Sequence, residues 1–149
     1  MLRTALACLI LLPALLPAVA RADECDGLAR QIADAIGGKV GRRAGPSIDI
    51  RVSGPLKVDV TCRAEPIVQA SSSEATPSPA YFRDLAIASQ ILIGESAGTV
   101  EPIIANAYRA ALASRSKSFI QQSGWSASCY TDPGSSIRTL CSVGRIPPG

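Results

Sequence analysis

The sequence predicts an α+β domain in two layers, with three helices packed on a mostly antiparallel four-stranded sheet built from two hairpins. Three observations support this fold class. Apolar residues recur at helical spacing in three segments, and they alternate with polar residues in two pairs of segments that turn residues separate. Four cysteines also follow an apolar N-terminal run, which indicates an exported chain closed by two disulfides.

The N-terminus has the layout of a secretory signal peptide. Arg3 precedes an almost wholly apolar run over residues 5–20, and the small-x-small site Ala20-Arg21-Ala22 follows it. We expect a signal peptide over residues 1–22 and a single domain over residues 23–149. The alternative is an uncleaved membrane anchor, but the apolar run is short and interrupted by proline. The expected location is therefore periplasmic or secreted.

The charge of the mature chain would be close to neutral. Loss of Arg3 and Arg21 takes the 15 basic residues to 13, against 12 acidic ones, a net charge of +1. Such a chain has no electrostatic footprint for nucleic acid. After cleavage we expect no membrane span.

The first helix is predicted from Asp23 to the glycine pair that follows Ile36. Acidic residues crowd its start, where the helix dipole favours negative charge, and Leu28 and Ile32 begin its apolar stripe. Gly37 and the glycine after it supply a left-handed stop.

The first hairpin is predicted over residues 48–62, where the apolar period changes from 3.6 to 2. A turn at Ser53-Gly54-Pro55 separates the two strands. Val52 opposite Leu56 would put both apolar sets on one side of the sheet, and that requirement sets the register.

The middle of the chain is predicted to be a loop followed by a buried helix. Ile67 and Val68 could form a short edge strand, whereas residues 71–79 are too polar to bury and are expected to be a mobile loop. Ser78 then caps a helix with Pro79 in its first turn, and Gly94 ends it. Because this helix is apolar beyond one face, it should be the most buried of the three.

The longest helix is predicted over residues 100–119, with Pro102 tolerated in its first turn and Phe119 at the end of the apolar stripe that faces the core. A second hairpin then finishes the chain, and its turn lies around Asp132-Pro133-Gly134.

Cysteine usage favours structural disulfides over a metal or redox site. Cys8 leaves with the signal peptide, and the remaining cysteines form no C-x-x-C pair. The sequence contains no histidine, so a zinc site would need four distant thiolates in an oxidising compartment. The four that remain are Cys25, Cys62, Cys129 and Cys141.

Strand parity selects the disulfide pairing. In the second hairpin Cys129 can lie directly opposite Cys141, at the cross-strand spacing of about 4.5–5.5 Å that suits a disulfide. Cys25 and Cys62 then pair by elimination and join the first helix to the end of the second strand. From loop length, we expect the short bridge to stabilise by about 3 kcal/mol and the long one by about 4 kcal/mol.

The missing histidine also narrows the chemistry, because it excludes histidine-based acyl transfer and histidine general bases. Ser114 and Lys117 match the S-x-x-K spacing of penicillin-recognising serine enzymes, but the supporting motifs are missing. The last turn of an exposed helix explains these two residues better. We expect no cofactor, no metal and no catalytic residue, although an enzyme is not excluded.

Two further segments have ordinary structural explanations. The Gly-rich, basic segment over residues 37–45 could bind an anion, but its glycines follow a helix instead of leading into one. A cap and a turn with a basic rim account for it. Asp49 and Asp59 could lie close together on the outer sheet face, where Arg51 and Lys57 beside them indicate a surface charge ladder.

Two aromatic residues of the second hairpin differ in their expected surroundings. Trp125 shares the parity of Cys129, which favours the core over a ligand-stacking role. Tyr130 lies on the opposite side with Arg138, and this pair is the candidate contact surface, although cross-strand packing would also explain Tyr130.

The segments "ADECDGLARQIADAIGGKVGRR", "VTCRAEP" and "GWSASCY" resemble small exported alpha-proteobacterial proteins of unknown function. The resemblance covers about half of the mature chain; it implies a periplasmic location and no activity. The leading hypothesis is a non-enzymatic binding module for an envelope protein or another cell-envelope component. The alternatives are a small hydrolase-like enzyme using serine or carboxylates, and a small-molecule carrier.

Overall fold

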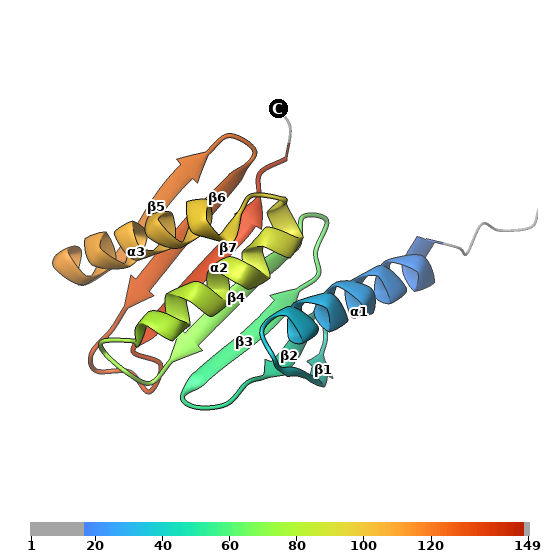
Figure 1. Cartoon of the computed structure of the whole chain (residues 1–149), viewed down its shortest axis with the longest axis horizontal. Helices are drawn as coiled ribbons and strands as arrows, with labels where there is room; N and C mark the ends of the chain where they lie inside the picture. The colour runs from blue at the N-terminus through green and yellow to red at the C-terminus, as the bar shows by residue number, and fades with distance from the viewer. Residues whose placement is uncertain (1–16, 148–149) are drawn as a thin grey trace, which may run out of the picture.

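The computed structural model describes residues 17–147, which form three helices and one seven-stranded sheet. The strand order is β1-β2-β3-β4-β7-β6-β5, and every neighbouring pair is antiparallel. Figure 1 shows the three helices side by side on one face of the sheet, with α2 between α1 and α3. The predicted α+β class and its two layers are therefore confirmed.

The helices are α1 (Pro17–Ala35), α2 (Pro79–Ile93) and α3 (Ala97–Ser114). α1 begins at Pro17 and not at Asp23 as predicted, but it ends as predicted: Gly37 has a φ of 66°, and the Gly38 N–H donates to the Ala33 carbonyl at 2.7 Å. Residues 1–16 of the predicted signal peptide lie outside the described residues. No helix within residues 17–147 has both the length and the hydropathy to cross a membrane.

The strands fall into two antiparallel meanders that join at the β4–β7 pair. The first meander contains β1 to β4 and the second contains β5 to β7. Their bounds are β1 (Lys39–Ala44), β2 (Ser47–Arg51), β3 (Leu56–Thr61), β4 (Ile67–Ser72), β5 (Lys117–Gln122), β6 (Trp125–Thr131) and β7 (Thr139–Arg145).

Both predicted hairpins are present, but the expected count of four strands is wrong. Arg51 pairs with Lys57, the register in which Val52 lies opposite Leu56, as predicted. Each hairpin is extended by strands that local pattern did not reveal. β1 formed where a cap and a turn were expected, because the basic segment after α1 pairs along the edge of β2.

β4 corrects the expected loop over residues 71–79. Ser71 and Ser72 belong to this strand and are 8% and 3% exposed, and β4 pairs with both β3 and β7 at the centre of the sheet. A polar sequence can lie there because strand pairing satisfies its backbone, and because the Ser72 hydroxyl accepts from the Glu74 N–H at 3.0 Å. The helix after it begins at Pro79 and ends at Gly94, as predicted.

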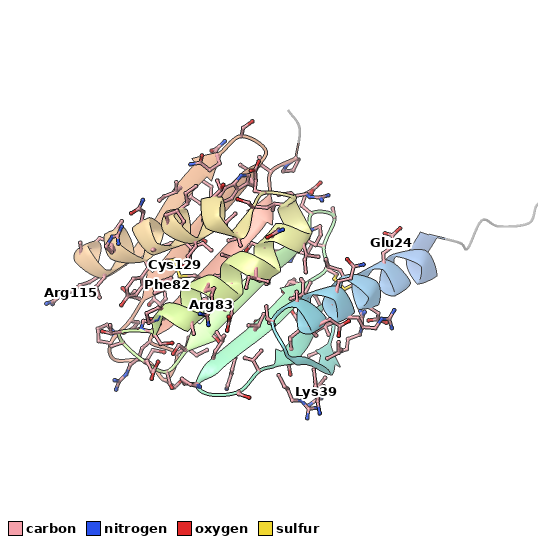
Figure 2. The ribbon with its side chains drawn as sticks, viewed as in Figure 1. Glu24, Lys39, Phe82, Arg83, Arg115 and Cys129 are labelled. Atoms are coloured by element: carbon pink, nitrogen blue, oxygen red, sulfur yellow. A yellow bond between two sulfur atoms is a disulfide. The ribbon has the colours of Figure 1, made fainter. Side chains whose placement is uncertain are left out.

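α3 is shorter than the predicted helix over residues 100–119. It begins at Ala97, where the Ser96 side chain accepts from the Thr99 N–H, and it ends at Ser114. Arg115 has a φ of 50°, and β5 follows from Lys117. Figure 2 shows Arg115 at the C-terminal end of α3. Phe119, expected on the apolar stripe of the helix, is therefore in a strand.

The core lies between the helices and the sheet, and α2 is deeply buried in it, as its composition predicts. Tyr81 of α2 is 2% exposed, and its hydroxyl donates to the Ala70 carbonyl at 2.6 Å and accepts from the Cys141 N–H at 3.0 Å. This hydroxyl bridges the two strands at which the meanders join. Trp125 is 4% exposed, in agreement with its expected place in the core.

Both predicted disulfides are present. Cys25 of α1 is bonded to Cys62 after β3, and Cys129 of β6 is bonded to its cross-strand partner Cys141 of β7. The first ties a helix to the sheet, and the second ties two neighbouring strands.

Candidate contact surface

One face of the sheet is covered by the three helices, and no described element covers the other (Figure 1). Strand alternation divides the side chains between the faces. Ile50, Val58 and Val143 are among the buried residues beneath the helices, whereas their neighbours in the chain point the other way. We call the uncovered side the open face.

Two adjacent rows cross the open face from β2 to β5. They follow from the pairing registers of the six strands. The first row consists of Asp49, Asp59, Gln69, Ser142, Ser128 and Phe119. The second consists of Arg51, Lys57, Ser71, Leu140, Tyr130 and Lys117.

The β2–β3 end of the open face is charged. Asp49 lies directly opposite Asp59, and Arg51 lies directly opposite Lys57, so each rung of the ladder joins like charges. Partial burial and then the nearby Asp49 carboxylate raise the pKa of Asp59, while a hydrogen bond from Thr61 lowers it. The two carboxylates are thus on facing residues of the open face, next to the facing pair Arg51 and Lys57.

The β5–β7 end of the open face combines aromatic and hydroxyl side chains, and we call it the aromatic end. Phe119 is 58% exposed and Tyr130 is 41% exposed, on neighbouring strands. Ser128 is the cross-strand partner of Phe119, and its hydroxyl shares a hydrogen bond of 2.9 Å with the Ser142 hydroxyl. Leu140 is the cross-strand partner of Tyr130. Exposed aromatic rings on a regular sheet are typical of contact surfaces.

Tyr130 and Arg138 are both exposed, and the strand register places them diagonally on the open face. The β6–β7 ladder continues one pair beyond the strands, because the Asp132 N–H donates to the Arg138 carbonyl at 3.0 Å. Arg138 is therefore a diagonal neighbour of Tyr130, about 7–8 Å away by the usual sheet spacing. The Tyr130 hydroxyl donates to Asp132 at 3.3 Å, and the charge of that carboxylate raises the pKa of the phenol.

The second disulfide lies directly behind the aromatic end. Cys129 and Cys141 point toward the helices, and the Cys129 sulfur lies 3.6 Å from the Ile104 carbonyl of α3. Figure 2 shows Cys129 on this helix-covered side. Tyr130 and Leu140, their immediate neighbours in the chain, point into the open face. The covalent bridge thus holds together the two strands that present these side chains.

Ser114 and Lys117 are not arranged for catalysis. The Ser114 hydroxyl donates to the Ala110 carbonyl at 2.9 Å, at the end of α3. Lys117 begins β5 beyond the turn at Arg115, and within residues 17–147 no hydrogen bond joins it to Ser114. Lys117 is instead the cross-strand partner of Tyr130, so it belongs to the aromatic end.

The Gly-rich basic segment forms β1 at an edge of the sheet. Its Arg43 makes an ion pair with Asp26 of α1, and its register with β2 is irregular between Val40 and Arg43. Figure 2 shows Lys39 at the start of this strand. These glycines do not lead into a helix N-terminus, so the backbone arrangement of a phosphate loop is not formed.

A small hollow lies where the loop after β4 meets α2. Its volume is about 70 Å³, and Leu56, Tyr81, Glu74 and Asp84 are among the residues that line it. Ligand pockets are usually ~300–1,000 Å³, so this hollow suits a few water molecules. No group of three or more cysteine or acidic side chains within the described residues could hold a metal ion.

Sequence reasoning missed three members of the aromatic end, namely Lys117, Phe119 and Leu140. The aromatic and β-branched pair Phe119-Ile120, a short distance ahead of Gly124, is the sequence signal that could have revealed β5. This signal was hidden because apolar residues at helical spacing, which predicted the preceding helix, continue in the sequence as far as Phe119.

No protein-family model, curated protein or solved structure matches the chain.

Proposed function

We propose that this chain is an exported, disulfide-stapled binding module that contacts a protein or another component of the cell envelope through the aromatic end. The exposure of Tyr130 and Phe119 on a regular, uncovered sheet face carries the proposal. The signal peptide predicted over residues 1–22 and the two disulfides support an oxidising compartment outside the cytoplasm.

Rigidity of the surface supports a binding role. Tyr130 of β6 and Leu140 of β7 are each adjacent in the chain to a cysteine of the Cys129–Cys141 bridge. A partner therefore meets side chains on a backbone that is already ordered, which reduces the entropy lost on binding. Arg138 adds a guanidinium beside the tyrosine, and both residue types are enriched in contacts that dominate binding energy.

Site-specific crosslinking in the producing cell tests the proposal. A photo-reactive phenylalanine analogue replaces Tyr130 or Phe119, and the same analogue at Leu112 of α3 is the control, since Leu112 is 45% exposed on the helix layer. We expect one shared crosslinked partner that differs from this chain from the two open-face positions, and none from Leu112. Equal yields at all three positions would contradict the proposal.

Affinity measurements with the crosslinked partner then give the contribution of individual side chains to the binding free energy. Tyr130→Ala and Arg138→Ala should each weaken binding by more than about 1 kcal/mol, the usual mark of an important contact. Ser114→Ala is the matched control and should leave affinity unchanged, because its hydroxyl only donates to carbonyls within α3. Loss of a catalytic activity in folded Ser114→Ala would instead favour an enzyme.

A further inference from the structure

The two edges of the sheet differ in how well they are protected against pairing with another chain. β1 carries Lys39, Arg42 and Arg43 in six residues, and its register shifts between Val40 and Arg43. Cations and bulges are the usual devices that block edge pairing. β5, at the other edge, has only Lys117 as a charged residue and pairs regularly with β6 along its whole length.

Hydrogen bonding in the second hairpin shows which groups of β5 point outward. The Asp132 N–H donates to the Arg138 carbonyl, and the Ile146 N–H donates to the Gly124 carbonyl. The backbone N–H and C=O groups of even-numbered β6 residues therefore bond to β7, whereas those of odd-numbered β6 residues bond to β5. The partners of those odd-numbered residues are the even-numbered residues of β5.

It follows that Lys117, Phe119 and Gln121 direct their backbone N–H and C=O groups away from the sheet. Figure 1 shows β5 at the end of the sheet. No backbone hydrogen bond to these outward groups is present within residues 17–147. Such a row of donors and acceptors, on a strand without a bulge, is a template for one more strand.

We propose that the protein forms a two-fold dimer in which β5 pairs antiparallel with β5 of a second copy, with Phe119 opposite Phe119. In this register Lys117 of each copy lies opposite Gln121 of the other. All outward-pointing groups of both strands are then paired, because each of these facing pairs exchanges both of its N–H···O=C bonds. The proposal stands on the edge geometry and does not depend on the proposed binding function.

Side chains agree with this register. The two exposed phenylalanine rings would meet on the open face, where each is now 58% exposed. Lys117 and its copy are offset by four residues, about 14 Å at the usual rise, which exceeds a screening length of about 8 Å. Pairing of β5 with β1 would instead give an open filament, and the cations and bulge of β1 oppose it.

Sedimentation of the oxidised protein from about 1 µM to about 1 mM tests the dimer. Gln121→Pro removes one outward N–H without touching a β5–β6 bond, so an edge strand tolerates it. Gln121→Ala is the matched control, because it changes the same side chain and keeps the N–H. We expect a monomer–dimer equilibrium whose Kd rises at least about tenfold in Gln121→Pro relative to Gln121→Ala.

A charge pair at the same position tests the register independently. Gln121→Lys would lie opposite Lys117 of the second copy and should weaken the dimer, whereas Gln121→Glu should tighten it, with a ratio that shrinks as salt is added. A monomer over the whole range, assemblies that keep growing with concentration, or equal Kd values for Gln121→Lys and Gln121→Glu would each overturn the proposal. Similar thermal midpoints at a concentration far below the Kd, where every variant is a monomer, confirm that the variants are folded.

Discussion

At the scale of single residues, the Asp49–Asp59 pair is the clearest local conflict in the fold. Two carboxylates lie directly opposite each other on the open face, and their rung is followed by one that pairs Arg51 with Lys57. Like charges at facing positions destabilise a sheet. The apolar residues between them in the chain must be buried, and this requirement outweighs the repulsion when the register is set.

We expect Asp59→Asn to stabilise the protein at pH 7 by about 0.5–1 kcal/mol, because it removes the repulsion from Asp49. Partial burial and Asp49 raise the pKa of Asp59 in the folded state. The stability that this carboxyl contributes is therefore fully present below its unfolded pKa and is lost as pH rises through the folded value. Urea unfolding at several pH values measures this dependence, which Asp59→Asn should flatten.

Asp34→Asn is the control for that series, since Asp34 is exposed on α1, away from the carboxylate pair. Its free energy of unfolding should stay within about 0.5 kcal/mol of the wild type, as for most surface substitutions. Destabilisation by Asp59→Asn at pH 7 would mean that the Thr61 hydrogen bond to this carboxylate outweighs the repulsion.

At the scale of elements, the β4–β7 pair joins the two meanders, and one of its facing residue pairs contains a glycine. Gly144 faces Ile67 across this pair. A Cβ added at Gly144 would lie 2.3 Å from the Ile67 Cγ2 atom, far inside van der Waals contact. The absence of a side chain at Gly144 thus allows the β-branched Ile67 to sit directly opposite it.

Gly144→Ala should therefore destabilise the protein by about 1–3 kcal/mol, the usual cost of overpacking. Ile67→Ala should relieve the clash, so the double variant should lose less stability than the two single changes together. Thermal and urea unfolding of all four proteins measure this coupling. Additive losses would contradict the contact, and Gly134→Ala, which meets only the Asp132 side chain at 3.4 Å, is a control for the alanine substitution.

At the scale of the whole molecule, each disulfide reinforces a different level of the architecture. Cys25–Cys62 spans 37 residues and fastens α1 to the end of β3, whereas Cys129–Cys141 spans 12 residues within one hairpin. α1 packs at the β1–β2 side of the sheet, away from the centre occupied by α2 (Figure 1). The long bridge therefore ties one of the two outer helices to the sheet.

We expect the exported protein to begin at Asp23 and to contain no free thiol. Ala20-Arg21-Ala22 is the expected cleavage site, cleavage there would remove Cys8, and the other four cysteines are bonded in pairs. Intact mass and thiol titration of unfolded, unreduced protein measure both properties. Two or more titratable thiols, or a mass that includes residues before Asp23, would contradict this expectation.

The sequence alone determined the elements whose pattern is complete within one segment. Alternation in residues 48–62 predicted the first hairpin with its register, and the parity of Cys129 and Cys141 predicted a disulfide that the structure contains. Glycine and proline marked both ends of α2. The exposure of Tyr130 beside Arg138 also followed from parity, because a strand with one buried face must turn its alternate residues outward.

Tertiary structure alone decided the elements whose stability comes from distant neighbours. β4 has a polar end because β3 and β7 satisfy its backbone from both sides, and β1 forms on the edge of β2. β5 exists because it pairs with β6 and because the Ser118 hydroxyl donates to the Ala107 carbonyl of α3. Local periodicity carries no information about these partners. For that reason Phe119, apolar at helical spacing, was expected in the core and lies exposed on the open face.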